Sequence, residues 1–436
     1  MPKAAPDTVI KGGTIIDETG TRRADVVIAG GAIVAVGDNL DAKSVIDASG
    51  CIVSPGFVDL HTHLREPGRE EAETIETGTR AAALGGYTAV VAMPNTEPTI
   101  DSAELVRDVM AMAVGKSCAV FPAGAITVGR QGEQLAPMAE MARAGVRLFT
   151  DDGSGVQDAA LMRRALEYAK GLSFVFADGR GVTLAQHCED DALAAGGAMH
   201  EGAWSARLGI PGQPSSAETA MVLRDLELVR LTGASMHFLH LSTAESLTAV
   251  AAAKAAGFPV TAEVTPHHFT LTDACCCDYD STYKVNPPLR TEADLEAVKA
   301  ALVAGTVDAI ATDHAPHAPE LKELPFDQAP PGMLGLETAL ALAITELALP
   351  LEQIVGYMSW RPARIAGIDA DHGGPIEAGR PAHICVFDPE QEWVVDARAL
   401  ASKSRNTPYE GRKLKGKVRH VFGWGGPAVI DGEAQR

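Results

Sequence analysis

Hydrophobic and polar positions follow two different rhythms along the 436 residues. At both ends of the chain, short β-branched runs are separated by turns rich in Gly and Asp, a pattern that predicts strands joined by tight turns. These runs occupy residues 8–20, 24–38, 44–56, 372–395 and 416–433. We therefore expect the two ends to form one small β-sandwich domain, residues 1–55 plus 368–436, with the middle of the chain inserted between them.

The middle of the chain, residues 56–367, alternates strand-like apolar runs with helix-like runs. Most of the helix-like runs end in Gly, which commonly follows the last turn of a helix. Strand-like runs occupy residues 57–61, 86–95, 118–127, 146–153, 182–190, 234–242, 258–268 and 307–317. Eight strands alternating with helices are typical of the (β/α)₈ TIM-like barrel, an α/β fold. We expect this barrel here, with one helix in 336–349 and another in 351–367 at its end.

Length, charge and cysteine usage narrow the possible functions. The chain exceeds the usual size of one compact domain, which suits a barrel of about 250 residues plus a smaller domain. The formal net charge of −20 argues against binding to nucleic acid or to anionic membrane surfaces. There is no run of about 18 apolar residues and no signal-peptide pattern, so we expect a cytoplasmic protein. The seven cysteines form no CxxC pair, and reduced thiols are expected.

The stretch PGFVDLHTHLREPG, residues 55–68, carries the first candidate chemistry. An apolar strand ends there with His61 and His63, which lie two positions apart and therefore on the same side of an extended chain. Two imidazoles that point into one space can hold a metal ion, and Zn²⁺ accepts neutral imidazole nitrogen. Arg65 follows at once, and its guanidinium suits an anionic substrate. The alternative interpretation is a strand end with two surface histidines.

Metal-type ligands also stand at the ends of later strand-like runs. Asp151 and Asp152 end the fourth, His187 the fifth, His240 the sixth and Asp313 the eighth. Because the carboxyl ends of barrel strands share one rim, these side chains should converge with the first pair into a binuclear site. Each residue alone has a structural explanation, since a lone His on an apolar strand is more often a core residue and DDG is more often a turn. Their combination favours the metal site.

The remaining histidines are weaker candidates. His237 lies three positions before His240, so alternation along a strand would point it to the other side, and we expect it to be structural. Spacing alone leaves four histidines open and predicts packed or solvated roles for four more. The first group is His267, His268, His314 and His317, and the second is His200, His372, His383 and His420.

Motifs along nearly the whole chain match a known family. They are PGFVDLHTHLREPG, GYTAVVAMPNTEP, FTDDG, AQHCED, HLST, TAEVTPHH, NPPLR, ATDHAPH and NTPYEG. Together they resemble the type I dihydroorotases of the amidohydrolase superfamily, and the combination is far more specific than HxH alone. Two departures are the Cys275–Cys277 run and His383, which stands where relatives usually have Asp. Neither departure touches the expected site, and the sequence assigns no role to the cysteine run.

The resemblance implies a site residue by residue. In that family the second Asp of FTDDG bridges two zinc ions, which selects Asp152 over Asp151. The metal ligands for two Zn²⁺ per subunit would be His61, His63, Asp152, His187, His240 and Asp313. The substrate would be held by His63, Arg65, Asn95, Asn286, His317 and the backbone of Pro331 and Gly332.

The implied reaction is the reversible cyclisation of N-carbamoyl-L-aspartate to (S)-dihydroorotate and water, the third step of de novo pyrimidine biosynthesis. Two cations lower the pKa of a bound water from about 16 towards about 7, which provides hydroxide near neutral pH. In the hydrolytic direction this hydroxide would attack the ring amide carbonyl. Asp313 would accept the proton and pass it to the departing nitrogen, while Arg65 and Asn95 hold the α-carboxylate.

Three alternatives come from different classes. A hydantoinase or allantoinase would share the barrel, but its metals are usually bridged by a carbamylated Lys at the end of the fourth strand. Between His63 and His187 the only lysines are Lys116 and Lys170, and neither is placed for that role. A non-catalytic scaffold for aspartate transcarbamoylase would be expected to lose ligands, and a plain binding protein ranks last. Expected partners are the small-molecule substrate and a second copy in a homo-oligomer (a dimer), with aspartate transcarbamoylase as a further candidate.

Overall fold

Strands from both ends of the chain pair within one sheet. The computed structural model describes residues 7–435, and β7 (Ile52–Pro55) pairs antiparallel with β18 (Ile384–Val394), Pro55 lying opposite Ile384. This seven-stranded sheet has the order β21-β20-β19-β18-β7-β2-β3. Its other members are β2 (Thr14–Asp17), β3 (Gly20–Arg23), β19 (Lys413–Gly423), β20 (Gly426–Ile430) and β21 (Glu433–Ala434).

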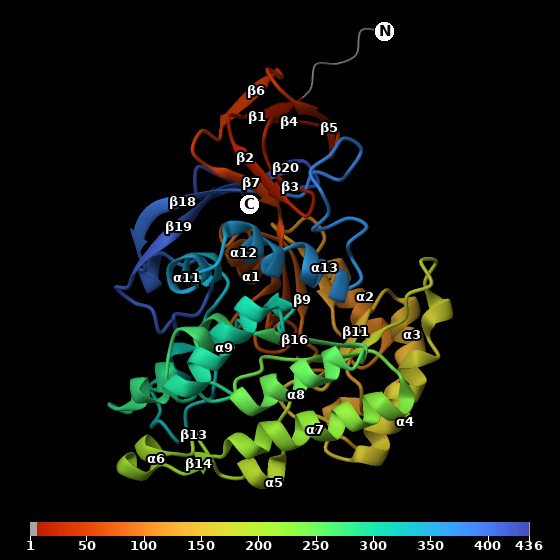
Figure 1. Cartoon of the computed structure of the whole chain (residues 1–436), viewed down its shortest axis with the longest axis vertical. Coiled ribbons are helices and arrows are strands. Elements are labelled where there is room, and N and C mark those ends of the chain that lie inside the picture. The colour runs from red at the N-terminus through yellow and green to blue at the C-terminus, as the bar shows by residue number, and fades with distance from the viewer. Residues whose placement is uncertain (1–6, 436) are drawn as a thin grey trace.

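A second sheet packs against the first. It has the order β5-β4-β1-β6, with β1 (Thr8–Lys11), β4 (Asp25–Ala29), β5 (Ala32–Gly37) and β6 (Ser44–Asp47). Buried side chains from both sheets, including Ile10, Val26, Val53 and Phe422, form one apolar core between them. The sandwich lies above the rest of the molecule in Figure 1. These pairings support the proposed division into residues 1–55 plus 368–436 and residues 56–367.

The middle of the chain forms the predicted barrel. Its strands are β8 (Phe57–Thr62), β9 (Tyr87–Ala92), β10 (Ala119–Pro122), β11 (Leu148–Thr150), β12 (Thr183–Gln186), β15 (Met236–Phe238), β16 (Val260–Val264) and β17 (Ala309–Ile310). They pair in parallel as β10-β9-β8 and β11-β12-β15-β16-β17. Parallel bridges from Gly124 to Phe149 and from Thr62 to His314 join the two groups, so the barrel closes.

Helices connect the strands and cover the outside of the barrel (Figure 1). The main ones are α1 (Ile75–Leu84), α2 (Ala103–Met112), α3 (Met138–Arg143), α4 (Ala159–Lys170), α7 (Ser215–Thr232), α8 (Ala244–Ala255), α9 (Glu292–Ala304) and α11 (Ala339–Glu346). Capping residues in the sequence determine where these helices begin and end, as α9 illustrates. The hydroxyl of Thr291 accepts a hydrogen bond from Asp294 N at the start of α9, and Gly305 ends that helix with a φ of 73°.

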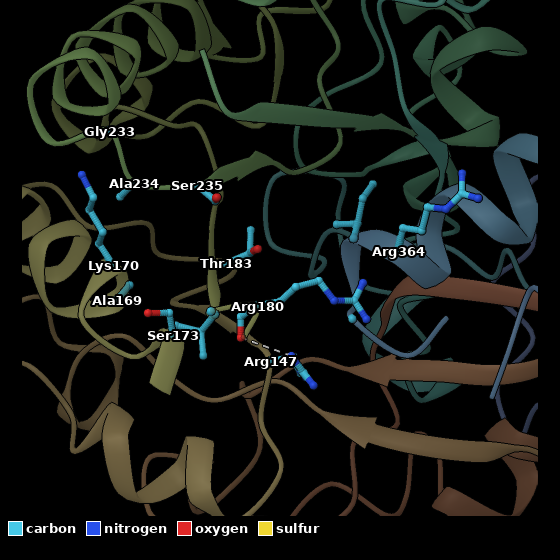
Figure 2. A pocket seen from close by; sticks show the side chains of 14 residues that line it. Arg147, Ala169, Lys170, Ser173, Arg180, Thr183, Gly233, Ala234, Ser235 and Arg364 are labelled. Atoms are coloured by element: carbon cyan, nitrogen blue, oxygen red, sulfur yellow. Dashed lines mark hydrogen bonds between the residues drawn. The ribbon is translucent and has the colours of Figure 1, made fainter. Parts of the chain in front are cut away.

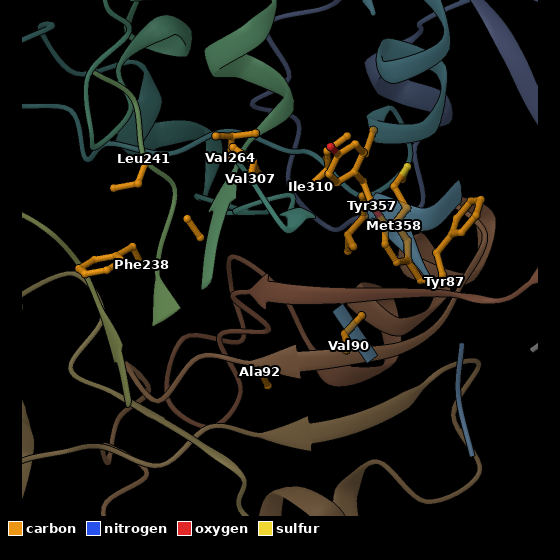
Figure 3. Close-up of a cluster of buried hydrophobic side chains, with 14 of the residues drawn as sticks. Tyr87, Val90, Ala92, Phe238, Leu241, Val264, Val307, Ile310, Tyr357 and Met358 are labelled. Carbon is orange, nitrogen blue, oxygen red and sulfur yellow. The ribbon is translucent and has the colours of Figure 1, made fainter. Parts of the chain in front are cut away.

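Two apolar layers hold the barrel together. Small and branched side chains such as Val58, Leu60, Ala89 and Ala185 fill the interior. The outer layer joins strands to helices. Figure 3 shows Tyr357 and Met358 beside Ile310 of β17. Both layers are fully buried, so the strand ends that carry the candidate site are held rigidly.

The predicted single helix over 351–367 is wrong, because the structure contains two helices there. They are α12 (Leu351–Met358) and α13 (Trp360–Ile365), separated by Ser359 with φ −126° and ψ −88°. Pro362 explains the break, since its ring would clash with the carbonyl of Met358 in a continuous helix. Beginning a new helix at Trp360 places Pro362 in a first turn, where proline is tolerated.

Several short elements lie between the main strands and helices. They are α5 (Asp191–Ala194), α6 (Ala203–Leu208), α10 (Pro319–Lys322), β13 (Met199–His200), β14 (Gly212–Gln213) and the 3₁₀ turns Val128–Arg130, Ser173–Val175, Pro266–Phe269, Asp273–Cys276, Ser281–Tyr283 and Ala397–Ala399. The segment after β18 also reaches back to the barrel. Ser404 Oγ donates to Ala72 O at 2.6 Å, and Asn406 Nδ2 donates to Ala315 O at 3.0 Å. No helix within residues 7–435 is long and apolar enough to span a membrane.

Candidate metal centre

The six predicted metal ligands meet at the carboxyl ends of the barrel strands. His61 is the second-last residue of β8, and the other five follow the ends of their strands by one to three residues. These five are His63, Asp152, His187, His240 and Asp313. All six side chains are buried, with exposures of 5% or less. The predicted convergence of separate strand ends therefore exists in the folded chain.

Asp152 lies at the centre of the group. Its Oδ1 is 3.3 Å from His61 Nε2, 3.5 Å from His187 Nδ1 and 3.6 Å from His240 Nε2. Its Oδ2 is 3.6 Å from His63 Nε2. One carboxylate thus faces imidazoles with both of its oxygens, which is the geometry needed to contact two cations.

Asp313 faces the other side of the first histidine pair. Its Oδ1 is 3.1 Å from His63 Nε2 and 3.5 Å from His61 Nε2. His187 Nδ1 and His240 Nε2 are 3.0 Å apart. Ligands around a tetrahedral Zn²⁺, with bonds of about 2.0–2.1 Å, are separated by about 3.3 Å. The spacings in this cluster therefore fit atoms that share a small divalent cation.

An unsatisfied buried atom supports the same interpretation. His61 Nε2 has no hydrogen-bond partner among residues 7–435, although it lies between Asp152 and Asp313. Two groups of three ligand atoms, each within 4.8 Å of one another, include it: His61, His63 and Asp313, and His61, Asp152 and His240. Because a buried polar atom normally has a partner, a cation is the species that this nitrogen lacks. The residues present fit a metal site.

The electrostatics keep both carboxylates ionised. Burial would raise the pKa of Asp152, but the nearby imidazoles of His61, His187 and His240 lower it well below its usual range. The pKa of Asp313 is also lowered, because interactions with His61 and His63 outweigh the effect of burial. Anionic carboxylates beside imidazoles are the donor set that Zn²⁺ prefers.

Asp151 and Asp152 have different partners despite their adjacency. Asp151 Oδ1 accepts from the backbone N–H groups of Ile126 at 2.8 Å and Thr127 at 3.0 Å, and its other oxygen contacts the Thr127 hydroxyl. Asp151 therefore fixes the loop after β10, while Asp152 faces the histidines. This division supports the choice of Asp152 over Asp151 as the bridging residue.

Glu263 of β16 supports the cluster and was missed in the sequence. Its Oε1 lies 3.1 Å from His61 Nδ1, and its Oε2 lies 3.0 Å from His237 Nε2. Burial would raise its pKa, but these two histidines lower it to about 2. A carboxylate behind a metal-type His fixes the ring and its tautomer. The available signal was a lone Glu within the apolar strand VTAEV.

His237 contacts Thr261 and Glu263 and does not line the cavity, which agrees with the expected structural role, but the expectation that it points to the other side of the strand is wrong. His237 belongs to the same buried chain of contacts as His61, through Glu263. The alternation argument failed because β15 ends at Phe238 and the backbone then changes direction, with a φ of 32° at His240. Side-chain parity applies only within a strand.

A second missed carboxylate, Asp59, fixes the turn that carries Asp313. Its Oδ1 accepts from Thr312 N at 2.8 Å, and its Oδ2 accepts from Thr312 Oγ1 at 2.7 Å. Burial raises its pKa to about 6 despite these hydrogen bonds. The turn is strained, since Asp313 has a φ of 46°. Strained backbone at non-glycine residues concentrates at functional sites, and Arg65, with a φ of 62°, is a second case here.

A cavity of about 240 Å³ opens beside the cluster. Five of the six clustered residues line it, together with Arg65, Arg69, Asn95, Gly153, Val285, Asn286, Ala315, His317 and Pro330–Gly332. Arg65 is 7% exposed, and its Nε donates to Pro316 O at 3.1 Å. Every predicted substrate residue therefore lies on the wall of one cavity, which the structure brings against the metal-type ligands.

The two predicted asparagines contact the histidines directly. Asn95 Oδ1 lies 2.9 Å from His63 Nδ1, and its Nδ2 donates weakly to Asp152 Oδ2 at 3.5 Å. Asn286 Nδ2 lies 3.3 Å from His187 Nε2. Turning the Asn286 amide over would let its Oδ1, which has no partner among residues 7–435, accept from His187 Nε2–H. That arrangement leaves His187 Nδ1 with a lone pair for a cation.

The backbone of Pro331 and Gly332 is already hydrogen-bonded. His317 Nε2 donates to Pro331 O at 2.8 Å. Burial and the nearby Arg65 lower the pKa of His317 to about 3, so the imidazole is neutral and Nε2 carries its single N–H. Gly332 N donates to Lys284 O at 2.9 Å. The Gly332 N–H is thus committed within the protein, whereas Pro331 O keeps a second lone pair on the cavity wall.

Comparisons with known proteins agree with this site. A family profile described as dihydro-orotase-like matches residues 50–246. A dihydroorotase of Pelotomaculum thermopropionicum is 48% identical over 417 residues, covering 94% of this chain and 95% of the relative. A dihydroorotase of Streptomyces coelicolor is 46% identical and covers 98% and 99%. The chain belongs to the dihydroorotase family.

Solved structures of other cyclic-amide hydrolases share the fold. L-hydantoinase from Arthrobacter aurescens superimposes with a TM-score of 0.87 at 23% identity, covering 99% of this chain and 98% of that one. D-hydantoinase from a Thermus species gives 0.83 at 27% identity, covering 98% and 96%. The barrel with an attached β-sandwich is therefore common to the dihydroorotase family and these enzymes.

Two of the larger cavities lie at the opposite, amino-terminal ends of the strands in this member of the dihydroorotase family. One, of about 360 Å³, is lined by Arg147, Lys170, Arg180 and Arg364 (Figure 2). Lys170 and Arg364 point away from its centre, and Asp178 pairs with Arg147 at 2.9 Å and with Arg180 at 3.1 Å. These cations are engaged in structural contacts and do not converge on a ligand.

The two lysines considered for a carbamate bridge line these two cavities. Lys170 Nζ donates to Thr232 O at 2.7 Å beside the 360 Å³ cavity. Lys116 lines the other cavity, of about 480 Å³, and pairs with Glu76 at 3.0 Å. Both lie at the end of the barrel away from Asp152, as the sequence predicts.

Proposed function

We propose that this chain is a dihydroorotase that interconverts N-carbamoyl-L-aspartate and (S)-dihydroorotate plus water through a binuclear zinc site. The observation that carries the proposal is Asp152, whose two oxygens face four imidazoles from three strand ends within 3.6 Å. Family membership supports a hydrolase of cyclic amides, and the clustered His and Asp side chains support metal dependence.

The donor set divides naturally between two Zn²⁺ ions. His61, His63 and Asp313 would hold one, His187 and His240 the other, and Asp152 would contact both. When bound, such ions act as Lewis acids and activate water at neutral pH. A short Asp bridge supplies the negative charge that a carbamylated Lys provides in other cyclic-amide hydrolases.

Asp313 is the residue proposed to move the proton. Its carboxylate lines the cavity and stays anionic, so it can accept a proton from the attacking water and deliver it to the ring nitrogen that leaves. Asp59 supports this role from behind by holding the backbone and hydroxyl of Thr312. In the cyclisation direction the same carboxylate removes the proton from the attacking nitrogen.

The remaining cavity residues would bind the substrate. Arg65 presents a guanidinium to the α-carboxylate, with Asn95 and His317 beside it, and this local positive charge offsets the overall charge of −20. Asn286 and His63 would contact the carbonyl side of the ring. Pro331 O can accept from a ring N–H, while Gly332 closes the wall.

Partners and location remain predictions. A homo-dimer, an association with aspartate transcarbamoylase and a cytoplasmic location are carried forward from the sequence. The hydantoinase alternative is not favoured, because Lys116 and Lys170 both lie away from the site. The non-catalytic scaffold is not favoured either, because all six ligand-type residues are retained.

Replacing the proton carrier tests the proposal. Asp313→Asn should retain much of its bound zinc but lose at least about a hundredfold in turnover of dihydroorotate. Asp308→Asn is the matched control, since Asp308 lies near the opposite end of the same strand and pairs with Lys254 at 2.8 Å. Wild-type rates in Asp313→Asn would contradict the assignment.

A further inference from the structure

The cavity wall formed by residues 330–332, here called the strap, is anchored by one ammonium group. Lys322 Nζ donates to Pro330 O at 3.0 Å, to Gly332 O at 3.1 Å and to Lys284 O at 3.5 Å. An ammonium has three protons, and three backbone carbonyls surround this one. Lys322 ends α10, within the segment that connects His317 to the strap.

Lys322 holds the strap from behind the cavity. Pro330, Pro331 and Gly332 line the cavity, whereas Lys322 does not. Asn406 Nδ2 shares one of its acceptors, donating to Gly332 O at 3.1 Å. With His317 on Pro331 O and Lys284 O on Gly332 N, every polar backbone group from Pro330 O to Gly332 O is occupied.

The fit around the strap leaves little room for movement. Gly332 has a φ of 142°, which favours glycine, and a Cβ there would lie 2.8 Å from both His317 Nε2 and Ala315 Cβ. The strap therefore has one position in which its carbonyls are satisfied and its backbone clears the cavity. Loss of an anchor would release it from that position.

The charge on Lys322 is held at an energetic cost. Burial, and secondarily the charge of Lys284, lowers its pKa to about 7, while Asp280 acts weakly in the other direction. A lysine exposed on the surface would stay charged without this cost of burial. The side chain is nevertheless placed among three carbonyl acceptors, and this geometry points to a structural role for its donors.

We propose that Lys322 is a positioning residue that holds the strap against the substrate, an inference that rests on the proposed function. Removing its donors leaves Pro330 O without its partner and Gly332 O with Asn406 alone, and the strap then samples positions in which it no longer closes the cavity. Substrate affinity weakens because closure must be restored on binding. The metal ligands are untouched, since none contacts Lys322.

The hold of Lys322 on the strap, here called the clamp, can be tested by hydrogen exchange without reference to activity. Lys322→Met keeps the unbranched stem but removes all three donors, and it should speed exchange of the Gly332 amide by about tenfold or more. Lys299→Met is the matched control, because Lys299 pairs with Glu296 on α9, and it should leave that exchange within about twofold. Unchanged exchange in Lys322→Met would overturn the clamp.

Kinetics then test whether the clamp serves the substrate. In Lys322→Met the KM for dihydroorotate should rise about tenfold while kcat falls much less and zinc content stays at the wild-type level. If Lys322→Met does not fold, Lys322→Gln carries the same measurements. Faster exchange with an unchanged KM would overturn the positioning role. A wild-type chain inactive on dihydroorotate would instead contradict the proposed function, and the exchange data would still decide whether Lys322 holds the strap.

Discussion

Glu263 Oε1 lies 3.1 Å from His61 Nδ1, so a buried carboxylate fixes which nitrogen of His61 faces the metal centre. Glu263→Gln keeps the shape of the side chain but removes its negative charge. Its amide can also turn its NH₂ group, in place of the oxygen, towards His61 Nδ1. We expect zinc affinity to fall about tenfold to a hundredfold, as is usual when the carboxylate behind a ligating His is lost.

Competition with a chromophoric chelator measures that affinity. Glu296→Gln serves as the control, since Glu296 lies on the exposed face of α9 and contacts only Lys299 among its ion-pair partners within residues 7–435. Equal zinc affinity in Glu263→Gln and wild type would show that the contact with His61 does not support the metal.

Arg65 should separate substrate binding from metal binding. Its guanidinium lines the cavity but is not among the clustered ligand atoms. Arg65→Ala should therefore retain its zinc and lose tenfold or more in kcat/KM, equivalent to about 1.5–3 kcal/mol for a charged hydrogen bond. Arg163→Ala, which removes an exposed pair with Glu167 on α4, should leave kcat/KM unchanged. Normal kinetics in Arg65→Ala would remove this residue from the site.

The metal bridge proposed at Asp152 should need no lysine carbamate. Lys116 and Lys170 are both engaged at the other end of the barrel, so reconstitution with zinc should give the same activity with or without bicarbonate. Asp152→Ala should lose bound zinc, while Lys116→Ala and Lys170→Ala stay active. A modified lysine in the intact mass, or recovery that depends on bicarbonate, would favour the hydantoinase-like alternative.

His383 makes the stability of the fold sensitive to acid. It is 4% exposed, stacks on His372 with ring centroids 4.0 Å apart, and accepts from Trp424 N at Nδ1. Burial lowers its pKa from 6.5 to about 4. The contribution of neutral His383 to the free energy of unfolding is therefore fully present above pH 6.5 and is lost as the pH falls towards 4. The loss occurs because His383 in the unfolded chain is protonated at a higher pH than in the folded chain.

The comparison variant is His383→Asn, which keeps an acceptor for Trp424 N but cannot be protonated. Between pH 7 and pH 4 the free energy of unfolding of the wild type should fall by up to about 3 kcal/mol more than that of the variant. Urea denaturation across this range measures the difference. Parallel pH profiles would show that His383 is not held neutral by burial.

The metal-type ligands were predictable because each follows an apolar run. Asp152 and His187 come within two residues of a strand end, and a closed barrel brings all such ends to one rim. The pattern locates the rim without any knowledge of side-chain contacts. Asp152 was separated from Asp151 only by resemblance, and the structure supplies the physical reason in the loop contacts of Asp151.

Residues that support the ligands could not be derived in this way. Which neighbour Glu263 faces depends on the stagger between β16 and β8, which sequence spacing does not define. His237 was misjudged because parity fails once the chain leaves a strand. Lys322 lies only ten residues before Gly332, but Asn406 reaches the same carbonyl from 74 residues away, so no local pattern indicates their shared acceptor.

The central claim is most directly tested by comparing three cyclic amides on one enzyme preparation. The purified zinc-loaded chain would be incubated separately with dihydroorotate, hydantoin and allantoin, and ring opening followed by the loss of each cyclic amide. We expect a kcat/KM for dihydroorotate at least about a hundredfold above the other two, since only dihydroorotate has a carboxylate for Arg65 to bind. Faster opening of hydantoin or allantoin, or no opening of dihydroorotate, would contradict it.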